Sequence, residues 1–148
     1  MLGDDGPHAF VTDDGGTTWS SIAGDLPKSL FLRCIREDAK TPNLLFGATQ
    51  RGIYVTLDRG RHWRSMRINM PATAIYDLQI ESAQDDLVAA SHGRGVWILD
   101  DLRPLEALAA AQPAGPTFVA PRTAVRMWRW APINTFTNGT LPDNTYLR

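Results

Sequence analysis

The chain has few of the features that tie a protein to a compartment or to a charged partner. Its one cysteine, Cys34, cannot form an internal disulfide and is expected to be a small buried hydrophobic residue. The formal net charge is -1, so no overall field attracts nucleic acid or an anionic membrane. No apolar run approaches the roughly 18 residues of a membrane-spanning helix. Residues 1–5 lack the basic and apolar segments of a signal peptide. These absences predict no nucleic-acid or membrane partner.

Signatures of catalysis are also missing. The sequence has no Ser-His-Asp order, zinc-ligand spacing, Walker loop or dinucleotide fingerprint. The three histidines, His8, His62 and His92, stand far apart in the chain, so a shared metal site is not expected. We therefore predict no catalytic residue, no metal and no cofactor in this chain.

What the chain does contain is a repeat with a period in the low forties. Residues 12–19 and 56–63, 44 positions apart, both read Thr-x-Asp-x-Gly-x-(Thr/His)-Trp. Residues 95–101 form a third, partly degraded copy that aligns with 52–58, 43 positions earlier. A repeat of this length with short strands and a turn signature is typical of a β-propeller blade. The predicted fold class is all-β: a partial propeller of about two to two and a half four-stranded antiparallel blades, too few to close a ring.

Short β-branched and aromatic runs between turn residues mark the individual elements. Strands are expected at 8–13, 18–22, 30–37, 44–49, 52–57, 62–68, 74–81, 86–91 and 95–100. Pro104, followed by a Leu-, Glu- and Ala-rich run that Pro113 closes, predicts a short helix beginning near Asp101. The expected organisation is therefore propeller blades over 1–101, helix and linker over 102–116, and a partly ordered tail over 117–148, in which 117–130 alternates loosely like a strand.

The needs of a hairpin loop explain the repeated residues without any ligand. The glycine supplies a positive φ, and the aspartate accepts hydrogen bonds from backbone N–H groups of its own loop. The threonine adds a hydroxyl hydrogen bond, and the tryptophan is expected to cover the loop and bury apolar area. The residues given this structural role are Thr12, Asp14, Gly16, Thr18 and Trp19 in the first loop and Thr56, Asp58, Gly60 and Trp63 in the second.

The repeated pattern resembles the Asp box, or BNR repeat, of sialidases, xyloglucanase-like glycosidases, the sortilin-type propeller and photosystem assembly factors. The stretch 91–101 is similar to the end of the propeller in large secreted bacterial proteins labelled "glycosyl hydrolase, BNR repeat". The resemblance implies an extracellular or periplasmic parent protein. Because so few blades leave two blade faces open, the expected partners are the remaining blades of the parent protein or further copies of the chain. From the resemblance, the tail is expected to supply the first strand of a following β-sandwich domain.

Propeller geometry predicts where a ligand binds. The loops between the second and third strands of each blade share one rim with the loops between blades, and the Asp-box hairpins lie on the opposite face. The residues predicted to contact a ligand at this rim are His8, Gln50, Arg51, His92 and Arg94. The loops between blades add Asp25, Lys28, Asn69 and Thr73.

A plainer interpretation of the last rim loop competes with ligand binding. Ser91 and His92 would then hydrogen bond to the backbone of their own loop. Arg94 would pair with an acid such as Asp77 or Asp101. Under this interpretation the loop is satisfied internally and presents no binding group.

Polar rim loops without a catalytic constellation favour a non-catalytic scaffold that recognises a protein or a glycan. The alternative is a part of a BNR-repeat glycoside hydrolase, which needs two carboxyl groups about 5–10 Å apart. The acids expected toward the rim, Asp4, Asp5 and Asp77, match no such motif, so the catalytic acids of an enzyme would lie mostly outside this chain. A third hypothesis gives the chain a purely structural role in closing the propeller.

Overall fold

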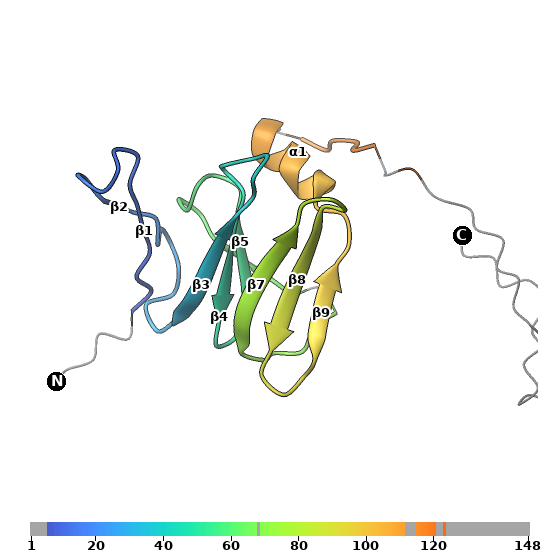
Figure 1. Ribbon diagram of the computed structural model, residues 1–148, viewed down its shortest axis with the longest axis horizontal. Helices are drawn as coiled ribbons and strands as arrows, with labels where there is room; N and C mark the ends of the chain where they lie inside the picture. The colour runs from blue at the N-terminus through green and yellow to red at the C-terminus, as the bar shows by residue number, and fades with distance from the viewer. Residues whose placement is uncertain (1–5, 68, 112–114, 121–122, 124–148) are drawn as a thin grey trace, which may run out of the picture.

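The computed structural model describes residues 6–67, 69–111, 115–120 and 123 (Figure 1). It contains three antiparallel sheets and one short helix, which confirms a mainly β fold. The first sheet pairs β1 (Phe10–Val11) with β2 (Ser20–Ser21). The second has the order β3 (Leu32–Glu37), β4 (Leu45–Thr49), β5 (Gly52–Thr56), β6 (Arg64–Met66). The third joins β7 (Ile75–Glu81), β8 (Asp86–Ser91) and β9 (Val96–Leu99), and helix α1 (Arg103–Ala111) follows.

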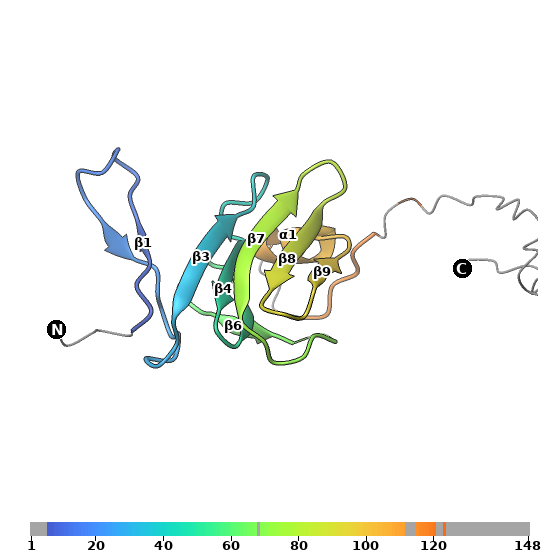
Figure 2. The ribbon, with the colours of Figure 1, turned by 60° about the horizontal axis from the view of Figure 1, so that its bottom comes forward.

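The three sheets stand side by side in chain order. Figures 1 and 2 show the β1–β2 hairpin on the N-terminal side, the β3–β6 sheet in the middle and the β7–β9 sheet on the far side. We call the end that carries the 49–52 and 91–95 turns the turn end, and the opposite end, where α1 lies, the helix end. Because the strands are antiparallel, β3 and β7 both begin at the turn end.

Alternation along the strands builds two apolar clusters on opposite faces of the middle sheet. Ile53 and Val55 point toward the third sheet and join a core that also contains Phe46, Ile75 and Leu78. On the other face, a smaller cluster is built from Leu26, Leu30, Leu45 and Trp63, with Tyr54 packed against it. Since side chains alternate across a strand, β5 contributes to both clusters. The middle sheet is therefore covered on both faces.

Side chains at strand edges also tie the second sheet to the third. The Arg36 guanidinium donates one hydrogen bond to the carbonyl oxygen of Leu78, with Nε to O of 2.7 Å, and pairs with the Asp77 carboxylate at 2.6 Å. These contacts join β3 to β7, which lie next to each other in space although 42 positions separate Arg36 from Leu78. The repeat therefore places equivalent strands of successive units side by side.

Helix α1 covers the helix end of the two larger sheets. Leu102 and Ala109 are fully buried in the core between these sheets, and Leu105 packs against it. The helix begins two residues later than the predicted start near Asp101, with Pro104 in its first turn, where a missing N–H leaves no hydrogen bond broken. The predicted helix is thus confirmed. It is too short to cross a membrane, and no other described segment could do so as a helix.

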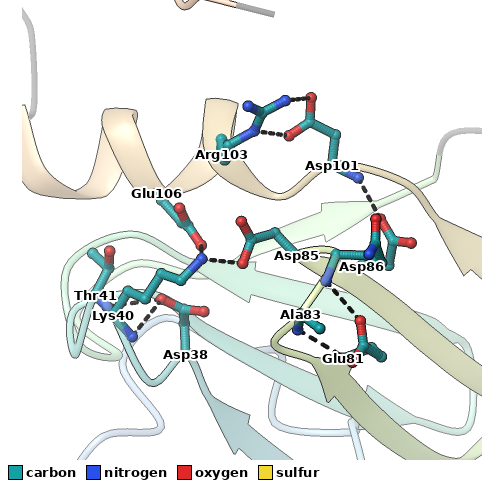
Figure 3. A network of polar contacts seen from close by, with 11 residues as sticks. Asp38, Lys40, Thr41, Glu81, Ala83, Asp85, Asp86, Asp101, Arg103 and Glu106 are labelled. Carbon is teal, nitrogen blue, oxygen red and sulfur yellow. Dashed lines mark hydrogen bonds and ion pairs between the residues drawn. The ribbon is translucent and has the colours of Figure 1, made fainter. Parts of the chain in front are cut away.

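A polar network at the helix end holds α1 to the strand turns (Figure 3). Lys40, in the β3–β4 turn, contacts the Asp85 carboxylate, and its Nζ lies 3.9 Å from Oε1 of Glu106 on the helix. Burial, followed by repulsion from Asp38, raises the pKa of Glu106. On the other side of the helix start, Asp101 pairs with Arg103 at 2.6 Å. Lys40 therefore links the helix residue Glu106 to Asp85 in the turn between β7 and β8, and the acidic groups of this network outnumber its basic groups.

Several details differ from the sequence-based expectations. The first unit has two-residue strands where 8–13 and 18–22 are expected, and its β1 and β2 pair only with each other. Cys34 is half-buried rather than buried, since it sits at the edge of the core. Residues 115–120 have no regular structure, and most of the expected 117–130 strand and of the 117–148 tail lies outside the described residues.

Candidate ligand-binding site

Two β-bulges at equivalent positions create the most distinctive surface of the molecule. In β3 the register with β4 shifts between Leu32 and Cys34, and in β7 the register with β8 shifts between Ile75 and Asp77. The unpaired residues are Arg33 and Tyr76, 43 positions apart. Bulges bend a strand and redirect its side chains, and they are frequent beside binding sites. Both side chains are therefore presented on the exposed surface at the turn end.

Arg33 and Tyr76 form a compact group with two further residues. The guanidinium carbon of Arg33 lies 4.1 Å from the ring centroid of Tyr76 and 5.5 Å from that of Phe31. The His92 ring stacks on Tyr76 with centroids 5.1 Å apart and an angle of 29° between the rings. Phe31 and Tyr76 nevertheless remain 48% and 49% exposed. We call these four residues the aromatic–arginine cluster.

Neighbouring loops hold the cluster in place. The Gln50 side chain accepts a hydrogen bond from the Phe31 N–H at 2.7 Å and donates one to the carbonyl oxygen of Ser29 at 3.0 Å. The N–H of His92 donates to the carbonyl oxygen of Ala74 at 2.8 Å. Gln50, predicted to contact a ligand, thus uses both ends of its amide to position the segment that carries Phe31.

The other predicted rim residues lie around the cluster or away from it. Arg51 and Arg94 are exposed in the two turns at this end, and within the described part of the chain neither guanidinium forms an ion pair. His8 lies in the first unit, before β1, and takes no part in the cluster contacts. Of the five predicted residues, the structure therefore brings only His92 into the cluster.

The competing interpretation of the last rim loop is half right. The Ser91 hydroxyl donates to the carbonyl oxygen of Gly95 at 2.6 Å, as expected for a loop satisfied internally. The predicted acid partners of Arg94 are occupied elsewhere: Asp77 binds Arg36, and Asp101 binds Arg103. Arg94 therefore pairs with neither acid and stays available to solvent and ligands.

The two repeated Thr-x-Asp-x-Gly loops, 12–19 and 56–63, contain the same hydrogen bonds. In the first, Asp14 Oδ1 accepts the N–H of Thr18 at 2.8 Å, and Thr12 Oγ1 accepts the N–H of Gly16 at 2.8 Å. The hydrogen bond from the Thr18 hydroxyl at 2.6 Å, followed by those from the Thr18 N–H and the Thr12 hydroxyl, lowers the pKa of Asp14 to about 2. The carboxylate is thus used by its own loop, as the sequence predicts.

The second loop repeats this arrangement with histidine in place of the second threonine. Asp58 accepts the N–H of His62 at 2.9 Å and the His62 ring Nδ1 at 2.5 Å, while Thr56 accepts the N–H of Gly60 at 2.9 Å. Burial by itself raises the pKa of Asp58. The hydrogen bonds from His62 and Thr56 outweigh that effect, so the pKa lies below its ordinary value of 3.8.

Replacing Asp58 by alanine is expected to lower the free energy of unfolding by about 1–3 kcal/mol at pH 7, because the His62 N–H loses its acceptor. Since the folded pKa is below the unfolded one, this contribution is complete above about pH 4 and is lost as the pH falls through the folded pKa. Urea unfolding of both proteins from pH 7 to pH 2.5 measures the difference. A difference that stays constant across this range would contradict the assignment.

The tryptophans of the two loops have different environments. Trp63 is 6% exposed, and its Nε1 donates to the carbonyl oxygen of Ile22 at 2.9 Å. Trp19 is 61% exposed, and its Nε1 donates within its own loop to Gly16 at 3.0 Å. The prediction that both tryptophans bury apolar area is therefore wrong for Trp19. The segment that covers Trp63 runs from Ile22 to Leu30 and follows the first unit. Among the described residues, no such segment covers Trp19.

The loop between the first two units supplies this cover and explains a further correction. Asp25 accepts the N–H of Trp63 at 2.6 Å, at the end of the second repeated loop, 56–63. Asp25 therefore lies away from the turn end. From the sequence it is expected at the turn end, as a residue of a loop between blades. The covering segment runs past the loop so closely that Gly60 faces Ile22.

The turn end offers binding groups rather than acid–base pairs. Asp77, the one described acid expected there, is held by Arg36, and Asp4 and Asp5 lie outside the described residues. Among the described residues, no three His, Cys, Asp or Glu side chains are grouped so as to hold a metal ion. Comparison with models of known families, with curated proteins and with solved structures finds no match to this chain. The aromatic–arginine cluster is therefore the feature on which a function can be argued.

Proposed function

We propose that this chain is part of an Asp-box β-propeller of the sortilin-like, BNR-repeat type, and that it acts as a non-catalytic recognition module which binds a glycan at the aromatic–arginine cluster. Three antiparallel sheets in chain order, with hydrogen-bonded Asp-box loops 44 positions apart, support the propeller assignment. In a propeller the first strand of each blade faces the central channel. The cluster, at the start of β3 and β7, would then lie at the mouth of that channel.

The observation that carries the proposal is the pair of equivalent bulges. One bulge alone would expose one side chain, whereas two at the same position of successive units put Arg33 directly against Tyr76. An exposed cation–π contact adds only about 0.5–1 kcal/mol to stability, so it gives little structural reason to leave two aromatic rings half exposed. A ligand that stacks on those rings supplies such a reason.

A carbohydrate matches the chemistry of the cluster. Phe31 and Tyr76 offer flat apolar surfaces for the C–H face of a sugar ring, and Arg33 and His92 offer N–H donors for its hydroxyl oxygens. Binding sites combine apolar surface with a few placed polar groups in this way. The ion pair of Asp77 with Arg36 leaves no free carboxyl pair here, which favours binding over glycoside hydrolysis in this part of the protein.

Replacing Tyr76 by alanine is expected to weaken glycan binding at least tenfold, because the central ring of the cluster is lost. A glycan array identifies the ligand, and calorimetric titration then compares wild type with Tyr76→Ala, Arg33→Ala and His92→Ala. Phe118→Ala is the matched control, since Phe118 is a fully exposed aromatic residue outside the cluster.

Two results would contradict this proposal. Unchanged affinity in Tyr76→Ala and Arg33→Ala would remove the site. A wild-type protein that binds no glycan on the array, but binds a peptide in a way that these substitutions weaken, would move the ligand class from carbohydrate to protein.

A further inference from the structure

The second and third sheets pack on each other through an apolar core, and we call such a contact between neighbouring units a junction. On the side of the middle sheet that faces the third, Phe46, Ala48, Ile53 and Val55 are all at most 8% exposed. The register pairs Phe46 with Val55 and Ala48 with Ile53, so the four form one continuous apolar patch across β4 and β5. Every member of the patch is covered by the following unit.

The third sheet has an equivalent apolar patch on β8 and β9. No described residue covers the part of this patch that lies on β9. The register pairs Val88 with Ile98 and Ala90 with Val96, which repeats the pattern of the middle sheet. Val96 and Ile98 are 65% and 62% exposed on β9, the last strand of the sheet. We call these four residues the trailing face. It has the composition of a junction but is open to solvent.

The first unit carries the opposite half of such a junction. Trp97 and Tyr54 occupy equivalent positions in the repeat, and each packs toward the preceding unit, Trp97 in the core between the larger sheets and Tyr54 in the smaller cluster. The residue at this position in the first unit is Phe10, which is 56% exposed. Trp19, the equivalent of the buried Trp63, is exposed beside the same unit. We call Phe10 and Trp19 the leading face.

We propose that copies of this chain associate head to tail, with the leading face of one copy packed on the trailing face of the next. The trailing face and Phe10 of the leading face are equivalent to the two surfaces that meet in the core between the two larger sheets. Repeat units gain stability from their neighbours, and each of the two faces exposes apolar surface that another unit would bury. A contact between different faces also fits a repeat better than a face packed on itself, because the core between the larger sheets joins two unlike faces. This inference stands apart from glycan binding, which uses the turn end.

The wild-type chain is expected to show a weight-average mass that rises with concentration between about 1 µM and 1 mM, the range of weak to moderate association. Sedimentation velocity without any ligand measures it. Trp19→Lys and Ile98→Lys should each abolish the rise, because a charge on either face would be buried without a partner. Both side chains are exposed within one copy, so circular dichroism should remain that of the wild type. Val96→Lys is a second substitution of the trailing face, and Phe118→Lys is the control.

Mixing the two variants tests the head-to-tail arrangement directly. Trp19→Lys keeps an intact trailing face and Ile98→Lys keeps an intact leading face, so an equimolar mixture should form a dimer that cannot grow further. A wild-type chain that stays monomeric up to 1 mM would overturn the proposal. So would a mixture that stays monomeric, or a Trp19→Lys variant that associates like the wild type, since the latter result indicates trailing faces packed on each other.

Discussion

Replacing Gly60 by alanine is expected to destabilise the protein by about 2–5 kcal/mol. A left-handed backbone costs a residue with a Cβ about 1–2 kcal/mol, and Gly60 has φ of +88°. A Cβ there would also lie 2.6 Å from the Cβ of Ile22 and against the Ile22 carbonyl oxygen. Forcing an extra methyl into a tight contact costs about 1–3 kcal/mol more. Equilibrium unfolding in urea measures the sum.

Gly16 is the matched control, because it occupies the same position in the first loop. Its φ is +97°, but an added Cβ would meet only the Trp19 ring, at 3.8 Å. Gly16→Ala should therefore cost only the backbone term, about 1–2 kcal/mol. Equal losses in the two variants would mean that the segment around Ile22 does not press on the second loop.

Replacing Trp63 by alanine is expected to cost about 3–5 kcal/mol, the range for removing a buried aromatic side chain. Trp63 is 6% exposed, packs with Leu45 in the smaller apolar cluster and donates its indole N–H to the carbonyl oxygen of Ile22. The substitution leaves a cavity in the smaller apolar cluster and an unpaired carbonyl oxygen. Thermal and urea unfolding should both report the loss.

Trp19→Ala provides the comparison within the same repeat. At 61% exposure it should change stability by less than about 1 kcal/mol in dilute solution. The two substitutions remove the same side chain from the same motif, so any difference reports the cover that the preceding unit provides. A large loss in Trp19→Ala would show that its own hairpin buries it, contrary to the structure.

Much of the secondary structure could be predicted because it depends on short-range signals. Short β-branched and aromatic runs between turn residues locate the strands of the two larger sheets within a few residues, and Pro104 with the following Leu and Ala residues locates α1. The loop hydrogen bonds of Asp14 and Asp58 also follow from sequence, since each joins residues at most four positions apart. Burial of the tryptophans does not follow, because the covering segment lies about 40 residues away.

The candidate site was only partly accessible to sequence reasoning. His92 could be proposed because its glycine-containing turn is recognisable in the sequence. Arg33 and Tyr76 lie inside predicted strands, where nothing in the sequence distinguishes them from ordinary strand residues. A bulge has no reliable residue signature, so the unpaired positions are visible only in the register. The one available signal was their 43-residue spacing, which marks them as equivalent positions of adjacent units.

The sequence by itself determined the repeat, the local geometry of the two Thr-x-Asp-x-Gly loops and the mainly β class, because each depends on residues that are close along the chain. Tertiary structure alone decided which equivalent residues are buried and which are exposed. Trp63 and Trp19, or Val55 and Ile98, have nearly the same local sequence and strand position, yet a neighbouring unit covers only the first of each pair. Burial is a property of the unit next in space, and for that reason the trailing and leading faces, like the cluster of Arg33 with Tyr76, emerge only when the sheets are placed side by side.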